Sequence, residues 1–155
     1  ELGRILRAYE ARVSSGLDQL VEFSRKVGAQ TRGKCLCHRD LHGWNLMRRD
    51  DALVLIDWED AGLSSPEDDL SRMADEPQFP TLLQAYQTVR PGFAPDRALM
   101  WWFKLRRTLV DIYEFTRQLQ TETLPAEAEQ DALYWLERSC MELDRLLTVQ
   151  PPAGG

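Results

Sequence analysis

Histidine and cysteine are scarce in this chain of 155 residues, which contains two of the first and three of the second. Cys35 and Cys37 form a C-x-C pair, Cys140 lies far along the chain, and the histidines are His38 and His42. No metal-ligand set of cysteine and histidine emerges from so few residues. An odd, sparse cysteine count is typical of the reducing cytosol, so we expect a cytoplasmic location.

Long apolar runs and an excess of positive charge are also missing. No window resembles a signal peptide or reaches the roughly 18 apolar residues of a membrane span, so the sequence predicts neither export nor membrane insertion. The net charge of -6 argues against nucleic acid as a partner. A composition of 43% hydrophobic and 28% charged residues is ordinary for a soluble globular domain with a core of its own.

Polar side chains are concentrated in one stretch, C-H-R-D-L-H-G-W-N-L-M at residues 37–47, which is followed by V-L-I-D-W-E at residues 54–59. Apolar runs at residues 46–48 and 53–56 flank residues 49–52. This arrangement predicts a β-hairpin with a four-residue loop.

The hairpin would bring three oxygen-bearing side chains together. In the register that keeps four residues in the loop, Asn45 lies opposite Ile56, and Asp57 follows at the open end. Asp40 reaches the same place through the preceding loop. Two carboxylates and an amide oxygen then converge, and hard oxygen ligands of this kind suit magnesium that carries substrate phosphates.

These residues resemble a known family. The pattern H-x-D-x-x-x-x-N at residues 38–45, followed by I-D-W at residues 56–58, looks like the aminoglycoside phosphotransferase and choline kinase superfamily, small-molecule relatives of the protein kinases. The family's usual loop is close to H-G-D-L-H-x-x-N, and here Arg39 replaces the glycine, which gives the H-R-D of protein kinases. Trp58, where protein kinases have Phe-Gly after the Asp, favours the small-molecule branch.

The resemblance implies a role for each motif residue. Asp40 would accept or orient the proton of the acceptor hydroxyl, and Asn45 and Asp57 would be ligands of Mg²⁺, with ATP or GTP as phosphate donor. Met47 would form an apolar floor under the adenine ring, although a core position explains it equally well. His38 would brace the loop.

Further residues are less certain in role. Asp69-Leu70 resembles the family's D-L-A element, whose Asp supports the catalytic loop through backbone N–H groups, with Asp68 as the alternative if the alignment shifts by one. His42 either contacts the acceptor or forms a loop-bracing hydrogen bond. We expect Trp44 and Trp58 to be packing residues rather than stacking platforms.

Hydrophobic periodicity predicts mostly helix around one small β ribbon, a mainly α fold with a minor β part (α+β). Ser65 is expected to cap a helix that has Pro66 in its first position, and the segment 59–63 is expected to be a loop. The other predicted elements are helices at 1–27, 79–89, 95–120 and from 125 onward, and a strand at 35–37.

This picture matches the C-terminal helical lobe of a protein-kinase-like fold. We expect residues 1–150 to form that lobe, followed by a disordered tail at 151–155. Within the lobe we expect a leading helix (1–27), a catalytic loop with a metal-binding hairpin (35–57) and a helical acceptor-binding subdomain (65–149). The family's N-terminal ATP-binding lobe, with its phosphate-covering loop and Lys–Glu pair, has no counterpart before residue 35, so this chain alone is expected to transfer phosphate poorly.

Acceptor binding in the family falls mainly to the C-terminal lobe. Candidate acids for a cationic acceptor are Glu59 and Asp60 just past the predicted metal ligand, and Asp111 and Glu114, which are three apart on one helix face. For any single one of these acids, a solvated helix face is the favoured interpretation.

The sequence therefore predicts an ATP- and Mg²⁺-dependent kinase for a hydroxyl group of a small molecule. The acceptor is open between an aminoglycoside-type antibiotic and a metabolite such as choline, thiamine, homoserine or a sugar. Two alternatives also remain: a non-catalytic kinase-like binding module, and a protein kinase fragment, which the missing A-P-E segment disfavours.

Overall fold

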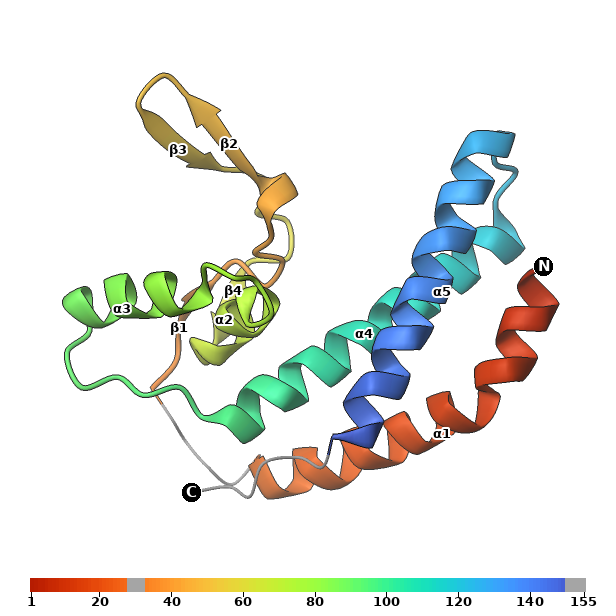
Figure 1. The fold of residues 1–155 in the computed structure, drawn as a ribbon, viewed down its shortest axis with the longest axis horizontal. Coiled ribbons are helices and arrows are strands. Elements are labelled where there is room, and N and C mark those ends of the chain that lie inside the picture. The colour runs from red at the N-terminus through yellow and green to blue at the C-terminus, as the bar shows by residue number, and fades with distance from the viewer. Residues whose placement is uncertain (28–32, 150–155) are drawn as a thin grey trace. The chain divides into compact units, whose positions relative to one another are not determined.

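The computed structural model describes residues 1–27 and 33–149, so the predicted tail at 151–155 lies outside the described residues. The chain is mainly helical, as the sequence predicts, but it has two small β ribbons where one was expected (Figure 1). The elements in chain order are α1 (Leu2–Val27), β1 (Cys35–Cys37), the 3-10 turn η1 (Gly43–Asn45), β2 (Leu46–Arg49), β3 (Ala52–Leu55), β4 (Gly62–Ser64), α2 (Glu67–Met73), α3 (Phe79–Val89), α4 (Arg97–Thr121) and α5 (Ala126–Thr148). No helix in the described ranges is both long and apolar enough to cross a membrane.

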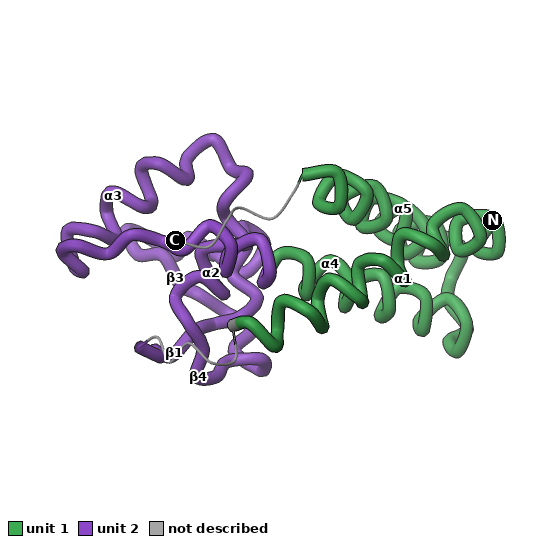
Figure 2. Tube along the Cα trace, turned by 90° about the horizontal axis from the view of Figure 1, so that it is seen from below, with its two compact units in different colours: residues 1–30, 104–152 green, residues 31–103, 153–155 purple. Residues whose placement is uncertain are grey.

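The chain divides into two compact units, which Figure 2 distinguishes by colour. Unit 1 comprises Glu1–Gln30 and Lys104–Pro152, and unit 2 comprises Thr31–Phe103 with Ala153–Gly155. The boundary falls within α4, whose first residues belong to unit 2 and whose remainder belongs to unit 1.

Unit 1 is a helical assembly in which α1 packs against α5. Its core is formed by apolar residues that recur at three- and four-residue steps, the spacing that places side chains on one helix face. The fully buried members are Ile5, Leu105, Leu136, Cys140 and Leu143. A Cβ added at Gly16 would lie 3.0 Å from a methyl group of Leu143, so α1 approaches its neighbour closely because this position has no side chain.

Unit 2 contains the two ribbons. In the β2–β3 hairpin, Arg48 pairs with Leu53 and Met47 pairs with Val54, so the predicted register is confirmed. The predicted loop length is wrong, because Arg49 also pairs with Ala52 and leaves only a two-residue turn. The first residue of that turn, Asp50, has a φ of 53°, a left-handed conformation that Asp tolerates better than most residues.

The second ribbon was not predicted. β4 pairs antiparallel with β1, with Leu63 opposite Leu36 and Gly62 opposite Cys37, where the sequence indicates a loop at residues 59–63. A strand of three residues that begins with glycine carries no alternating pattern, and its partner is distant in the chain. The ribbon ties the start of the polar loop at Cys37 to the segment that leads into α2.

The start of α2 also differs from the prediction. The hydroxyl of Ser65 does not cap the helix but hydrogen-bonds to the carboxylate of Glu67, and Pro66 occupies the N-cap position. Only the backbone oxygen of Ser65 serves the helix start, because it accepts a hydrogen bond from Asp68 N–H (2.9 Å).

Glu67 links two helix starts within unit 2. Its side chain is buried, and Oε1 accepts a hydrogen bond from the backbone N–H of Asp96 (3.1 Å). The Asp96 carboxylate in turn accepts bonds from Ala98 and Leu99 N–H, so Asp96 caps α4. A buried carboxylate thus fixes the residue that starts the long helix.

Candidate active site

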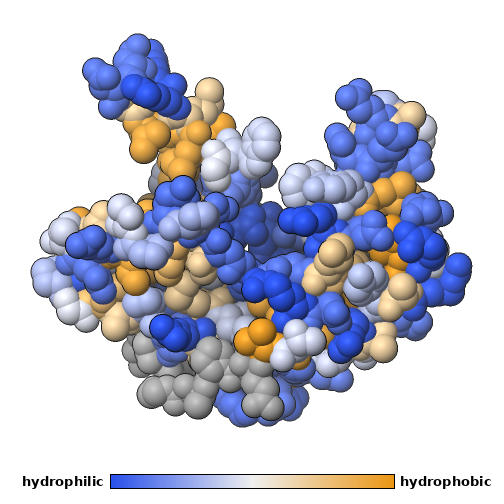
Figure 3. Space-filling model, viewed as in Figure 1, coloured by the Kyte–Doolittle hydropathy of each residue, from blue (hydrophilic) through white to orange (hydrophobic). Residues whose placement is uncertain are grey.

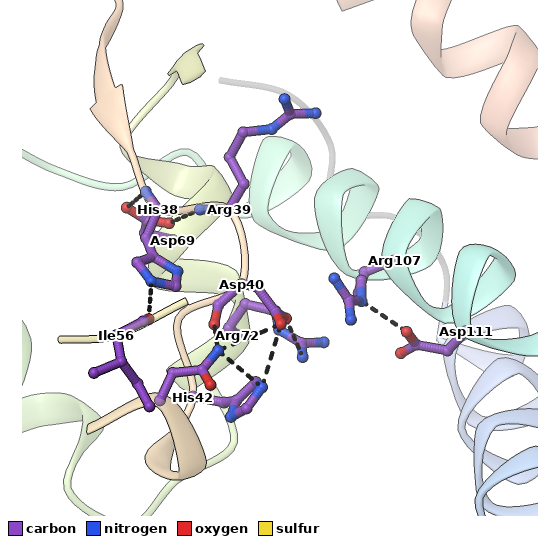
Figure 4. A network of polar contacts seen from close by, with 10 residues as sticks. His38, Arg39, Asp40, His42, Ile56, Asp69, Arg72, Arg107 and Asp111 are labelled. Carbon is purple, nitrogen blue, oxygen red and sulfur yellow. Dashed lines mark hydrogen bonds and ion pairs between the residues drawn. The ribbon is translucent and has the colours of Figure 1, made fainter. Parts of the chain in front are cut away.

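The loop that follows β1 is held from behind by α2. The backbone N–H groups of His38 and Arg39 donate to the two carboxylate oxygens of Asp69, at 2.9 and 2.7 Å (Figure 4). Asp68, the alternative considered from the sequence, instead lies 3.6 Å from Nε of Arg39. Two charge-assisted hydrogen bonds to one carboxylate determine the course of the backbone at the H-R-D residues.

Arg39 adopts a conformation that normally favours glycine. Its φ is 69°, in the left-handed region, where an L-residue loses roughly 1–2 kcal/mol relative to the right-handed helix. The resembled family usually has glycine at this position. The hydrogen bond from Arg39 N–H to Asp69 stabilises this backbone geometry in place of glycine's conformational freedom.

His38 connects the loop to the open end of the hairpin. It is 2% exposed, and its Nε2 lies 2.7 Å from the carbonyl oxygen of Ile56. A carbonyl oxygen only accepts hydrogen bonds, so Nε2 carries the proton. The edge of the ring meets Trp58 at 4.9 Å between centroids, and Trp58 Nε1–H donates to Leu55 O (2.8 Å). This arrangement fits the predicted bracing role and fixes the backbone just before Asp57.

The carboxylate of Asp40 is mostly buried and is contacted on both oxygens (Figure 4). Arg72 Nη2 lies 3.0 Å from Oδ1, while His42 Nε2 lies 3.4 Å from Oδ2. Asn45 Nδ2 is also 3.4 Å from Oδ2. These contacts orient the carboxylate that the motif marks as the catalytic group.

Asn45 faces Asp40 with its nitrogen. The amide Nδ2 donates to the Asp40 backbone oxygen (2.9 Å), and the side chain is 6% exposed. Its Oδ1 therefore points elsewhere, and within the described residues it accepts no hydrogen bond. An amide oxygen without an acceptor role in the fold is suited to bind a cation.

Asp57 follows the paired end of the hairpin in the chain. Ile56 N–H donates to Asn45 O (3.0 Å), so Asp57 directly follows a residue paired with Asn45. Asp57 has a φ of 65°, and such a strained backbone costs about 1–3 kcal/mol in a non-glycine residue. The sequence motif predicts a metal ligand at this strained and exposed position.

The donor set fits a magnesium ion that is only partly enclosed by protein. Across residues 1–27 and 33–149 there is no group of three His, Cys, Asp or Glu side chains placed to hold a metal. One amide oxygen and one exposed carboxylate supply two hard oxygen ligands, and Mg²⁺ usually retains water and phosphate oxygens in its remaining positions. The residues present are therefore chemically compatible with Mg²⁺.

The hairpin exposes apolar side chains that flank this site. Met47 is 54% exposed and lies opposite Val54, so it is not a core residue. Apolar surface is visible at the base of the hairpin, below its hydrophilic tip (Figure 3). Trp44 is 86% exposed, so the expectation that it packs is wrong, whereas Trp58 packs against His38.

The four acids predicted to bind an acceptor are divided between the two units. Glu59 and Asp60 are exposed and follow Asp57 in unit 2. The other two lie on α4 in unit 1 and have basic partners there. Asp111 accepts from Arg107 Nε (2.7 Å), and Glu114 accepts from Arg117 Nε (3.0 Å).

Cys37 contributes packing rather than reactivity. Its thiol donates to the carbonyl oxygen of Ser65 (3.3 Å) and lies 3.6 Å from Sγ of Cys35. Burial raises the pKa of the Cys37 thiol far above its ordinary value, and the contact with Cys35 adds to the effect. The neutral thiol is therefore a poor nucleophile.

The sequence motifs do not identify Arg72, a residue of α2 whose guanidinium contacts the Asp40 carboxylate. A signal for it exists, since positions 69 and 72 are three apart and share a helix face.

Comparisons with known proteins identify the family of the chain. Residues 4–101 match the model of a family described as APH, phosphotransferase enzyme family. No curated protein matches the chain significantly.

Two solved structures resemble the chain over nearly its whole length. Spectinomycin phosphotransferase APH(9)-Ia in complex with ADP and spectinomycin has a TM-score of 0.72 at 15% identity, covering 96% of this chain and 48% of that chain. The AMP-bound complex of the same enzyme has a TM-score of 0.64 at 16% identity, covering 97% and 50%. The chain thus spans about half the length of the structures it matches, and at this identity the likeness shows the fold alone.

Proposed function

The chain belongs to the phosphotransferase enzyme family, and from this premise we propose that it serves the Mg²⁺-dependent transfer of the γ-phosphate of ATP or GTP to a hydroxyl group of a small molecule. One observation supports the proposal: Asn45 Nδ2 donates to the Asp40 backbone oxygen, and Ile56, the residue before Asp57, donates its N–H to Asn45 O. Solved relatives with ADP or AMP bound support a nucleotide as the donor.

Each residue has a defined task in this reaction. The carboxylate of Asp40 orients the acceptor hydroxyl and accepts its proton as the phosphoryl group is transferred. Asn45 Oδ1 and the Asp57 carboxylate would hold Mg²⁺, which when bound neutralises the charge of the phosphates. His38 and Asp69 keep the loop in position, and catalysis then depends mainly on alignment and electrostatics.

The nucleotide and the acceptor use different surfaces. We propose that the exposed Met47 on the hairpin contacts the adenine ring. The ATP-covering lobe of the family, which is not among these 155 residues, is proposed to close over the ring. His42, beside Asp40, and the exposed acids Glu59 and Asp60 are proposed to face the acceptor. Asp111 and Glu114 are weaker candidates because each already pairs with an arginine.

The acceptor is proposed by its chemical class. Spectinomycin, the ligand of the related structure, makes an aminoglycoside-type antibiotic one candidate. A metabolite such as choline, thiamine, homoserine or a sugar is the other. An acidic acceptor surface would favour a cationic molecule in either case.

The test uses the full-length protein that carries this chain, with a panel of hydroxylated acceptors and acceptor-dependent ATP consumption as the readout. Asp40→Asn should lower turnover about 10²- to 10⁴-fold and leave nucleotide affinity within about twofold. Asn45→Ala and Asp57→Ala should weaken Mg²⁺-dependent nucleotide binding. The exposed Glu76→Gln is the matched control and should change neither quantity.

The outcomes separate the two classes of function. Loss of turnover in Asp40→Asn with intact nucleotide binding supports a kinase. A wild-type protein that binds Mg·ATP but transfers phosphate to none of the acceptors would instead be a non-catalytic kinase-like module. Turnover that survives in Asp40→Asn would show that the assigned role of Asp40 is wrong.

A further inference from the structure

The guanidinium of Arg72 lies against the carboxylate of Asp40. Nη2 is 3.0 Å from Oδ1, and the two side chains are only 21% and 16% exposed. An ion pair this shielded from water is less screened than a surface pair, and its hydrogen bond is charge-assisted. Arg72 comes from α2, far along the chain from the loop, so the contact is set by the tertiary fold.

The same helix contacts the loop at two different points. Asp69 accepts the backbone N–H groups of His38 and Arg39, and Arg72, three residues later on the same face, contacts the side chain of Asp40. Asp69 therefore fixes the path of the backbone, while Arg72 acts on the side-chain torsions that the backbone leaves open. Figure 4 shows the two contacts converging on consecutive loop residues.

We propose that Arg72 is a positioning residue for phosphoryl transfer, which holds Oδ1 of Asp40 so that Oδ2 faces the acceptor hydroxyl. A carboxylate has about four lone-pair sites, so one hydrogen bond to Oδ1 leaves capacity for the acceptor on Oδ2. His42 Nε2, which is 3.4 Å from Oδ2, marks the side from which the acceptor approaches. This inference rests on the proposed function, because it explains how the carboxylate of Asp40 is aligned for phosphoryl transfer.

The kinetic test compares Arg72→Ala, Arg72→Lys and a control in the full-length enzyme with an identified acceptor. Arg72→Ala should lower kcat about 10- to 100-fold, the equivalent of one charge-assisted hydrogen bond, and leave the KM values for nucleotide and acceptor within about twofold. Arg72→Lys should recover part of kcat because an ammonium group supplies a single donor. Added guanidinium ion should partly restore kcat in Arg72→Ala but not in Arg72→Lys.

Arg97→Ala is the matched control, because Arg97 is an exposed arginine of the same unit at the start of α4. It removes the same charge and should leave kcat within about twofold. A kcat that is unchanged in Arg72→Ala would overturn the proposal. A raised KM for nucleotide at constant kcat would also overturn it, because the guanidinium would then serve the phosphates rather than Asp40.

A second measurement does not depend on activity or on the Arg72 variants folding. In the wild-type protein, NMR signals of the Arg72 guanidinium should show restricted rotation, and Asp40→Asn should release it. Free rotation in the wild type would overturn the proposal even if the protein transfers phosphate. If rotation is restricted but the protein has no transfer activity, the proposed function is refuted. The ion pair by which Arg72 orients Asp40 would still be supported.

Discussion

The two compact units bury different kinds of side chain. In unit 1 the buried residues are apolar except Thr108, whereas unit 2 buries His38, Asn45, Glu67, Asp68 and Ser71 beside its apolar core, as far as the described residues extend. Buried polar groups are stable only when they are paired, and in unit 2 most pairs join the loop, the hairpin and the helix starts. This difference indicates that hydrogen bonds and ion pairs stabilise the candidate active site, whereas apolar packing stabilises the helical unit.

A cavity-forming substitution in the core of unit 1 should lower stability more than the other changes considered below. Leu143 is fully buried and lies where α1 comes closest at Gly16. Leu143→Ala removes this contact and leaves a cavity, so we expect the free energy of unfolding to fall by about 3 kcal/mol in urea denaturation. Leu17→Ala, at a side chain that is 48% exposed, should cost less than about 1 kcal/mol. Equal losses of unfolding free energy at both positions would show that side-chain burial does not determine the stability of this unit.

Removing a polar contact in unit 2 should destabilise mainly the loop that the contact supports. Asp69→Asn removes the charge and turns an amide N–H₂ toward one of the two backbone N–H groups, so we expect a loss of about 2 kcal/mol. Hydrogen exchange of the His38 and Arg39 amides should accelerate. Glu76→Gln, an exposed change in the same unit, should leave both rates unaltered. Unchanged protection in Asp69→Asn would mean that another group supports the loop.

The left-handed residue at position 39 allows a comparison that leaves the polar contacts of its backbone in place. Arg39→Ala and Arg39→Gly both remove the pair with Asp68, but only glycine adopts a φ of 69° freely. We expect Arg39→Gly to be more stable than Arg39→Ala by about 1 kcal/mol in thermal or chemical denaturation. Equal stability would indicate that the loop relaxes to a right-handed conformation in the alanine variant.

The smallest expected effect is electrostatic and lies in unit 1. Burial raises the pKa of Glu142, but hydrogen bonds from Arg145 and Lys104 outweigh it and leave the pKa lowered. A lowered pKa in the folded state means that Glu142 stabilises the fold above its unfolded pKa of about 4.3 and loses this contribution as the pH falls through the folded value.

Glu142→Gln should therefore cost about 0.5–1 kcal/mol at pH 7, and the difference from wild type should shrink as the pH falls below about 4. Denaturation curves at several pH values check this, with the exposed Glu10→Gln as the control. A difference that grows toward low pH would mean that the sign assigned to the Glu142 pKa is wrong.

Several features of the fold could be predicted from local patterns. The helices follow from apolar residues at three- and four-residue steps, and the match of Asn45 to Ile56 follows from the length of the hairpin. The family and its mainly α architecture are confirmed by the comparisons. The roles of Asp40, Asn45 and Asp57 stay predictions; the structure joins Asn45 to Asp40 and pairs Ile56, the residue before Asp57, with Asn45.

Other features left no local trace. β4 is too short to show alternation, and Ser65 has the composition of a helix cap but bonds to Glu67 instead. Trp44 looked like a packing residue because tryptophan usually buries its large surface, yet it is 86% exposed. In each case the partner, or its absence, depends on what the rest of the fold places nearby.

Local spacing in the sequence specifies the helices, the hairpin register and the oxygen-bearing residues at the open end of the hairpin, because these depend on a few consecutive residues. Only the tertiary structure decided that Asp69 rather than Asp68 supports the loop, that Glu67 reaches Asp96, and that Arg72 holds Asp40. Those contacts join residues about thirty positions apart. Their formation depends on how α2 packs behind the loop, which no periodic pattern in the sequence records.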